Sequence, residues 1–219
     1  MIDPASVIEH TLLRADATRQ DIEHLCAEAR EHRFYAVCVN GSRVEQARHA
    51  LEETEVKVVT VAGFPLGATD ADAKRYEIEA AVDAGAHEVD VVLNVGRLKD
   101  GDDRYVLREL RDLVEAADGA PVKVILETGL LTRVEIVRAC QWVVEAEAAF
   151  VKTSTGFGPL GATVEDVLLL RESVGPNFGV KAAGGIRDLA TARAMLEAGA
   201  TRLGTSAGLA IVTAAQAGE

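Results

Sequence analysis

The chain has 219 residues, 48% of them hydrophobic, which excludes an intrinsically disordered protein and is enough to fill one large core. The net charge of −12, without any basic run, argues against nucleic-acid binding. No apolar run approaches the ~20 residues of a membrane span, and the first residues lack the features of a signal peptide. The three cysteines are far apart, so we expect no disulfide framework and a reducing, cytoplasmic location.

Short β-branched runs alternate with longer segments of helical pattern along the whole chain. The runs predict eight strands, at 7–12, 36–40, 56–63, 88–94, 122–128, 150–155, 179–184 and 202–205. The segments between them predict eight helices, at 21–32, 43–53, 70–85, 103–118, 132–147, 163–174, 188–198 and 206–214. Eight βα units indicate one domain over residues 1–219, a (β/α)8 TIM barrel whose last residues are frayed. A doubly wound open sheet is the competing architecture, but no G-x-G-x-x-G follows the first strand.

Helix ends carry the expected signals. Thr18 and Thr132 are each followed three residues later by an acidic residue, as in a capping box, and Asp188 occupies an N-cap position. Ala-Gly-Ala occurs at 84–86 and at 198–200, just before a strand in each case, where glycine suits the left-handed end of a helix. The two copies indicate a repeated βα unit.

Three strands carry charged residues where a buried strand should be apolar. Asp90 lies between valines in the fourth strand, Lys152 lies in the sixth with Ser154 on the same face, and Lys181 lies in the seventh. Each alone has a structural explanation, because a carboxylate can be buried with a partner and a lysine can extend to solvent. Two lysines on adjacent strands, with an aspartate two strands earlier, favour a functional site.

The two lysines together have a chemical purpose. Burial and a second ammonium group both disfavour the charged form of a lysine, and they can lower its pKa from about 10.4 toward ~7–8. A neutral amine attacks carbonyl groups, and Asp90 could relay the protons, so the combination indicates Schiff-base chemistry. Lys57 and Lys123 begin their strands, and we interpret both as solvated residues at the rim of the barrel's stability face.

Glycine loops follow the sixth, seventh and eighth strands, at 156–158, 184–187 and 203–208. Loops after strands seven and eight are the usual phosphate-binding place in barrels. Glu9 and Thr11 share a face of the first strand. Cys38 is interpreted as a small buried residue of the second strand, with a place in the pocket as the alternative. The five histidines show no ligand spacing, so we expect no metal.

The chain resembles the deoxyribose-phosphate aldolase family nearly from end to end. The matching segments, in order, are IEHTLL at 8–13, AVCV at 36–39, VAGFPLG at 61–67, EVDVVLNVG at 88–96, KVILET at 123–128, FVKTSTG at 150–156 and VKAAGGIR at 180–187. The resemblance implies a class I aldolase that cleaves 2-deoxy-D-ribose 5-phosphate reversibly to D-glyceraldehyde 3-phosphate and acetaldehyde. It implies no cofactor, small sugar phosphates and aldehydes as the partners, and a cytoplasmic homodimer or homotetramer.

The resemblance also implies roles for individual residues. Lys152 forms the Schiff base, Lys181 perturbs its pKa, and Asp90 acts with a water in proton transfer. The phosphate group lies on a set of loop residues, namely Gly156, Gly184, Gly185, Arg187, Gly204 and Ser206.

The sequence departs from the family pattern at four places. Many members have aspartate where this chain has Glu9, and some have lysine where it has Phe157. Asn40-Gly41 replaces a proline, and the chain has no C-terminal tyrosine. Two alternative functions stay open. The first is another Schiff-base aldolase or a transaldolase that uses a different donor, and the second is a non-catalytic barrel that binds sugar phosphates.

Overall fold

The computed structural model describes residues 3–218, so Met1, Ile2 and Glu219 of the expected domain lie outside the described residues. Eight parallel strands form a closed barrel in chain order, which confirms the predicted TIM barrel and excludes the open sheet. The strands are β1 Ile8–Leu12, β2 Ala36–Val39, β3 Lys57–Ala62, β4 Glu88–Val92, β5 Val122–Ile125, β6 Phe150–Lys152, β7 Gly179–Ala183 and β8 Arg202–Thr205.

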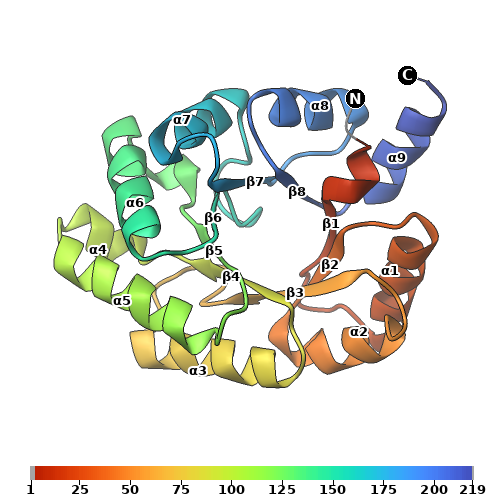
Figure 1. Cartoon of the computed structure of the whole chain (residues 1–219), viewed down its shortest axis with the longest axis horizontal. Coiled ribbons are helices and arrows are strands. Elements are labelled where there is room, and N and C mark those ends of the chain that lie inside the picture. The colour runs from red at the N-terminus through yellow and green to blue at the C-terminus, as the bar shows by residue number, and fades with distance from the viewer. Residues whose placement is uncertain (1–2, 219) are drawn as a thin grey trace.

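Helices surround the barrel, as Figure 1 shows. They are α1 Arg19–Glu31, α2 Val44–Ala50, α3 Ala71–Asp83, α4 Val95–Lys99, α5 Asp103–Ala116, α6 Arg133–Glu145, α7 Val164–Val174, α8 Leu189–Glu197 and α9 Gly208–Gln216. Short 3-10 helices occur at η1 Pro4–Val7, η2 Gly41–Arg43 and η3 Thr128–Leu130. Helix α4 was not expected from the sequence, and α9 continues two residues beyond its expected end, into the segment predicted to fray.

The predicted helix caps are confirmed. Thr18 and Thr132 both form complete capping boxes, and the Asp188 side chain accepts a hydrogen bond from the Thr191 amide. Gly85 and Gly199 have φ values of 97° and 108°, the left-handed conformation that favours glycine. These signals lie in the local sequence, which explains why they could be read without knowledge of the packing.

Strand residues alternate between two environments. Val89 and Val91 point outward into the main hydrophobic core between strands and helices, whereas Asp90 points into the barrel. One wall of the barrel interior is apolar. It is formed by residues of β2 and β3 together with the residue after β1, namely Leu13, Ala36, Cys38, Val59 and Val61. The other strands therefore carry the charged residues of the interior.

The β3–α3 loop is fitted closely to helix α3. Gly63 has a φ of 60°, and a Cβ atom there would lie 2.8 Å from Cε of Lys74. The Gly63 amide also donates to Glu77 of α3 at 2.7 Å. The loop therefore packs directly on the stem of a lysine side chain from α3.

Candidate active site

Lys152 is the last residue of β6, so its side chain lies near the carboxyl end of the barrel, where barrel enzymes carry their active sites. It is only 3% exposed. Its Nζ donates to Oδ2 of Asp90 at 2.7 Å. Strand register places Lys152 directly beside Lys181 of β7. The structure thus brings together the three residues that the sequence predicted as a site.

Asp90 accepts hydrogen bonds from three buried lysines. Its Oδ2 accepts from Lys152 at 2.7 Å and from Lys181 at 2.5 Å, and its Oδ1 accepts from Lys123 at 2.8 Å. Lys181 also donates to Glu9 of β1. Burial opposes the charge on Asp90, but the three ammonium groups outweigh it and hold the pKa of this carboxyl well below its ordinary value.

The expectation that Lys123 is a solvated rim residue is wrong. Lys123 is fully buried, and its Nζ lies 2.7 Å from Glu88, 2.8 Å from Asp90 and 3.6 Å from Glu9. It pairs in register with Asp90, so it points into the barrel although it stands near the start of its strand. Burial opposes its charge, but these carboxylates raise the pKa of Lys123. Lys57 is at the rim as expected, with a side chain 43% exposed.

The two lysines at the carboxyl end differ in their pKa values. Burial lowers the pKa of Lys152, and the charge of Lys181 lowers it further, while Asp90 opposes both. Burial also disfavours the charge on Lys181, but Asp90 and Glu9 outweigh it and raise the pKa of Lys181. Lys152 therefore loses its proton more readily than Lys181, which is the difference that Schiff-base chemistry needs.

The remaining predicted pocket residues lie around this cluster. Glu9 is buried and bonded to Lys181, and the Thr11 hydroxyl donates to the Glu9 carbonyl at 2.8 Å. Burial raises the pKa of the Cys38 thiol to about 11, so it is protonated at neutral pH. The ligand atoms of Glu9, Cys38 and Asp90 lie within 4.8 Å of one another. Both carboxylates form ion pairs with Lys181.

The glycine loops meet beside the sixth strand. Gly156, Gly184 and Gly185 have φ values of 84°, 92° and 78°, and a Cβ atom on Gly184 would lie 3.5 Å from the Cα of Gly156. Arg187 and Ser206 are exposed in the loops after β7 and β8. Gly204 is buried within β8, which agrees with the predicted strand at 202–205. A Cβ atom there would lie 3.1 Å from Cε of Lys181, so this glycine makes room for the lysine stem.

Sequence reasoning did not assign a role to Glu127, which follows β5. It has a left-handed φ of 54°, and its buried carboxylate accepts from the Thr155 amide at 3.2 Å and from the Thr155 hydroxyl. A Cβ atom on Gly158 would lie 2.6 Å from that carboxylate. Glu127 therefore fixes the loop that follows Lys152. The signal in the sequence was a charged residue at the end of an apolar strand.

Phe157 lies in the same loop, where some family members have lysine. Its ring is 57% exposed and meets the ring of Phe64 edge-on, with centroids 5.3 Å apart. Phe64 follows β3 and Phe157 follows β6, so the contact joins loops from opposite sides of the barrel. An apolar contact therefore joins the loops that follow β3 and β6 at the carboxyl-terminal end of the barrel.

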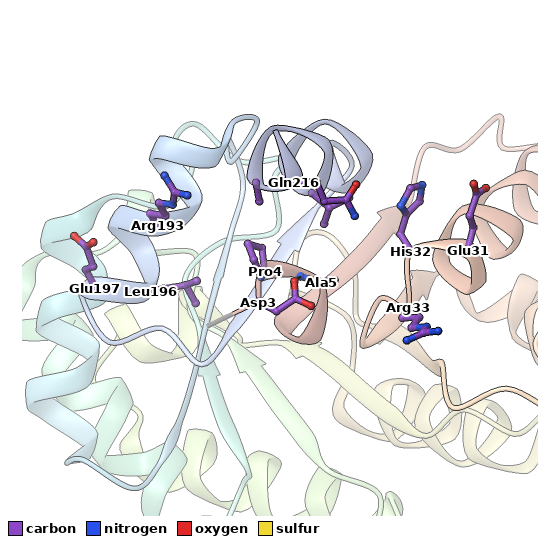
Figure 2. A pocket seen from close by; sticks show the side chains of 12 residues that line it. Asp3, Pro4, Ala5, Glu31, His32, Arg33, Arg193, Leu196, Glu197 and Gln216 are labelled. Carbon is purple, nitrogen blue, oxygen red and sulfur yellow. Dashed lines mark hydrogen bonds between the residues drawn. The ribbon is translucent and has the colours of Figure 1, made fainter. Parts of the chain in front are cut away.

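A cavity of about 1090 Å³ lies elsewhere, at the amino-terminal face of the barrel (Figure 2). Its lining comes from η1 and from the ends of α1, α8 and α9, and includes Asp3, His32, Arg33 and Glu197. None of the predicted site residues lines it. This cavity and the candidate chemistry are thus on different faces of the molecule. Within residues 3–218, no helix is long and apolar enough to cross a membrane.

Comparison with known proteins gives a consistent result. A family model described as DeoC/LacD family aldolase matches residues 6–214. Deoxyribose-phosphate aldolase from Alkaliphilus oremlandii is 55% identical over 95% of this chain and 94% of that protein, and the one from Thermococcus gammatolerans is 54% identical over 100% and 99%. The tetrameric deoxyribose-phosphate aldolase structure from Aeropyrum pernix matches with a TM-score of 0.91 and 33% identity, over 98% of this chain and 92% of the other. The chain belongs to the DeoC/LacD family of aldolases.

Proposed function

We propose that the chain is a class I deoxyribose-phosphate aldolase, which cleaves 2-deoxy-D-ribose 5-phosphate reversibly to D-glyceraldehyde 3-phosphate and acetaldehyde. The observation that carries the proposal is the buried Lys152 amine beside the Lys181 ammonium group at the carboxyl end of the barrel. The names of the relatives reported above support the same substrate. Lys152 is the proposed Schiff-base residue.

The chemistry begins with attack of the neutral Lys152 amine on the aldehyde carbon of the open-chain sugar. Loss of water then gives an imine. Removal of a proton from the C3 hydroxyl lets the C2–C3 electron pair move toward the imine, which releases glyceraldehyde 3-phosphate and leaves an enamine. Protonation of the enamine carbon and hydrolysis release acetaldehyde and restore the amine.

Asp90 and Lys181 are the proposed proton-transfer groups. Asp90 contacts both lysine Nζ atoms and can act through a water on the substrate's oxygen atoms. Lys181 keeps its charge and disfavours the charged form of Lys152. Because Lys181 is held by Glu9 as well as by Asp90, its ammonium group has a fixed position opposite the reacting amine.

The phosphate group is proposed to lie on Gly156, Gly184, Gly185, Arg187, Gly204 and Ser206. Gly204 also leaves room for the stem of Lys181. The left-handed glycines and the exposed Arg187 support this site, because backbone N–H groups and a guanidinium group are suitable anion donors. Phe157 supplies no charge here, so we expect a smaller contribution from phosphate than in relatives with lysine at that position.

The test is to trap the imine. The protein is incubated with acetaldehyde, reduced with borohydride and digested, and the modified peptide is located by mass. We expect a two-carbon adduct on Lys152, and none in a Lys152→Met variant. An adduct elsewhere, or no adduct, contradicts the mechanism.

The same trap separates the alternatives. An adduct with dihydroxyacetone but none with acetaldehyde would favour another Schiff-base aldolase or a transaldolase. Binding of 2-deoxyribose 5-phosphate with neither adduct nor turnover would favour a non-catalytic barrel. Both lysines that a silent barrel would be expected to lack are present, at positions 152 and 181.

We also propose that the chain acts as one domain and forms a homodimer or homotetramer in the cytoplasm. The tetrameric relative from Aeropyrum pernix supports an oligomer, and the three buried, unpaired cysteines suit a reducing compartment. Sedimentation analysis of the purified protein tests the oligomer, since a mass near the 23.2 kDa of one chain would contradict it.

A further inference from the structure

We infer that Glu88, at the amino-terminal end of the barrel, is a positioning residue that competes with Asp90 for Lys123 and so controls the charge around Lys152. The inference rests on the proposed function, because it concerns the proposed Schiff-base lysine. Glu88 does not contact the reacting amine. Its influence passes through Lys123, the residue that sequence reasoning placed at the solvated rim.

The contacts form a continuous path along the barrel interior. Glu88 is the first residue of β4 and is 2% exposed. Its Oε2 lies 2.7 Å from Lys123 Nζ, which donates to Oδ1 of Asp90 at 2.8 Å. The other oxygen of Asp90 accepts from Lys152 at 2.7 Å. Glu88 and Lys152 are therefore joined by two intervening side chains, all of them buried.

Glu88 is itself fixed by groups that close the lower end of the barrel. Its Oε1 accepts from the Tyr35 hydroxyl and lies 3.7 Å from Lys57 Nζ. The Arg202 guanidinium lies 3.6 Å from the centre of the Tyr35 ring and 5.5 Å from that of Phe150. These contacts come from different parts of the barrel end, so several groups hold the Glu88 carboxylate in place.

The charge of Glu88 limits how strongly Lys123 acts on Asp90. An ammonium group has three hydrogen atoms, and Lys123 distributes its charge between Glu88 and Asp90, with Glu9 at 3.6 Å. Without the Glu88 charge, Lys123 would interact more strongly with Asp90 and make it a poorer proton acceptor. The cluster would also lose one negative charge that stabilises a charged Lys152.

Several titratable or charged groups face this path. In chain order, these are Glu9, Tyr35, Cys38, Lys57, His87, Glu88, Asp90, Lys123, Lys152, Lys181 and Arg202. His87 also interacts with the charge of Glu88, but its ring nitrogens lie against the Val58 amide and Arg48. Lys57 and Arg202 stand on the far side of Glu88 and partly offset its charge. Glu88 is the one carboxylate of this described set that contacts Lys123 without contacting Lys152 or Lys181.

The experiment compares three single variants. Glu88→Gln keeps the shape and removes the charge. Glu88→Asp keeps the negative charge, but its side chain is one methylene shorter and places the carboxylate farther from Lys123. Glu109→Gln is the matched control, because Glu109 is another buried glutamate bonded to a lysine, at 3.2 Å from Lys74, outside the barrel interior. The readouts are the pH profile of kcat/KM and the pH dependence of acetaldehyde trapping on Lys152.

For Glu88→Gln we expect the acid limb of both profiles to move to lower pH by about half to one unit. We expect kcat to fall about tenfold, because Asp90 is a poorer proton acceptor, with KM nearly unchanged. Glu88→Asp should move the limb in the same direction by less. Glu109→Gln should leave the profile unchanged even though it costs stability.

If the acid limbs of both pH profiles are the same in Glu88→Gln and in the wild-type protein, the inference is wrong. If Glu88→Gln does not fold, Glu88→Asp decides, and an unchanged profile and kcat in that variant overturn it equally. The proposed function fails separately, since it requires the wild-type protein to form the adduct on Lys152. A wild-type adduct with unshifted variants therefore refutes the role of Glu88 alone.

Discussion

Two regions of the molecule bury lysines beside carboxylates, and only one of them lies in the barrel interior. Lys74 of α3 is fully buried and donates to Glu109 of α5 at 3.2 Å and to the Val92 carbonyl at 3.0 Å. Burial lowers the pKa of Lys74 and raises the pKa of Glu109. This is a simple pair, in which each charge has one ionic partner.

The barrel interior is different because its lysines converge on one carboxylate. Asp90 is shared by Lys123, Lys152 and Lys181, and Lys152 is left with the fewest carboxylate contacts of the three. Burial lowers the pKa of both Lys74 and Lys152, so a low pKa alone does not mark a site. The presence of a second ammonium group and a position at the carboxyl end of a strand distinguish Lys152.

The largest expected effect is at Lys152. Lys152→Met should reduce turnover of 2-deoxyribose 5-phosphate by about 10⁴-fold or more, because no other described lysine in the interior combines a lowered pKa with that position. The matched comparison is Lys74→Met, which should retain activity. Residual activity of Lys152→Met within tenfold of the wild-type protein would show that the two regions do not differ as described.

Asp90→Asn should reduce kcat by about 10²- to 10⁴-fold, since it removes the proposed proton acceptor. It should also lower the free energy of unfolding by about 3–5 kcal/mol at pH 7, because three buried lysines lose a common anion. The pKa of Asp90 is held below its ordinary value of 3.8 in the folded chain. Its stabilisation is therefore complete well above that value and is lost as the pH falls below it. Urea titrations should show that the difference in the free energy of unfolding between the wild-type protein and Asp90→Asn becomes smaller from pH 6 toward about pH 3. A difference that does not change with pH would contradict the pairing of Asp90 with the lysines.

Lys181→Leu should raise the pKa of Lys152, because it removes a nearby positive charge and leaves Asp90 free to stabilise the charged amine. The acid limb of kcat/KM should move to higher pH by about one to two units, so turnover at pH 7 falls about 10- to 100-fold and partly recovers at pH 9. An unchanged pH profile would count against the interaction between the two lysines.

Lys74→Met should have the smallest effect on activity and a large effect on stability. The variant leaves Glu109 buried without its partner, so we expect a loss of about 3–5 kcal/mol in the free energy of unfolding. The pH profile of kcat/KM should coincide with that of the wild-type protein. The double variant Lys74→Met with Glu109→Leu should recover much of the lost stability, as measured by denaturant titration; failure to recover would mean that packing rather than charge dominates.

The alternation of strands and helices could be predicted from local patterns, and so could the caps at Thr18 and Thr132, because these features depend on neighbouring residues. The convergence of Asp90, Lys152 and Lys181 could be predicted because parallel strands in register align equivalent positions. Helix α4 was not predicted, since five residues give too short a pattern to separate from a loop. The left-handed conformation of Glu127 also has no signal in a strand pattern.

Lys123 shows where the sequence reasoning used the wrong rule. Its place near the start of a strand was interpreted as exposure at the rim. Yet Asp90 and Lys123 stand 33 residues apart, close to the 29-residue spacing of Lys152 and Lys181, and the two residues pair in register. In a closed barrel, residues near the start of a strand still point into the interior, and three acidic neighbours from β1 and β4 compensate the charge.

The contact between Gly63 and Lys74 has a consequence for how sequences of this fold can diverge. The space beneath Gly63 is filled by the Lys74 stem, and the next residue is Phe64, which meets Phe157 at the mouth. A larger side chain at position 63 requires both a smaller one at position 74 and relief of a left-handed backbone. Changes at these two positions should therefore accompany each other, because the stem of Lys74 supports the loop that carries Phe64.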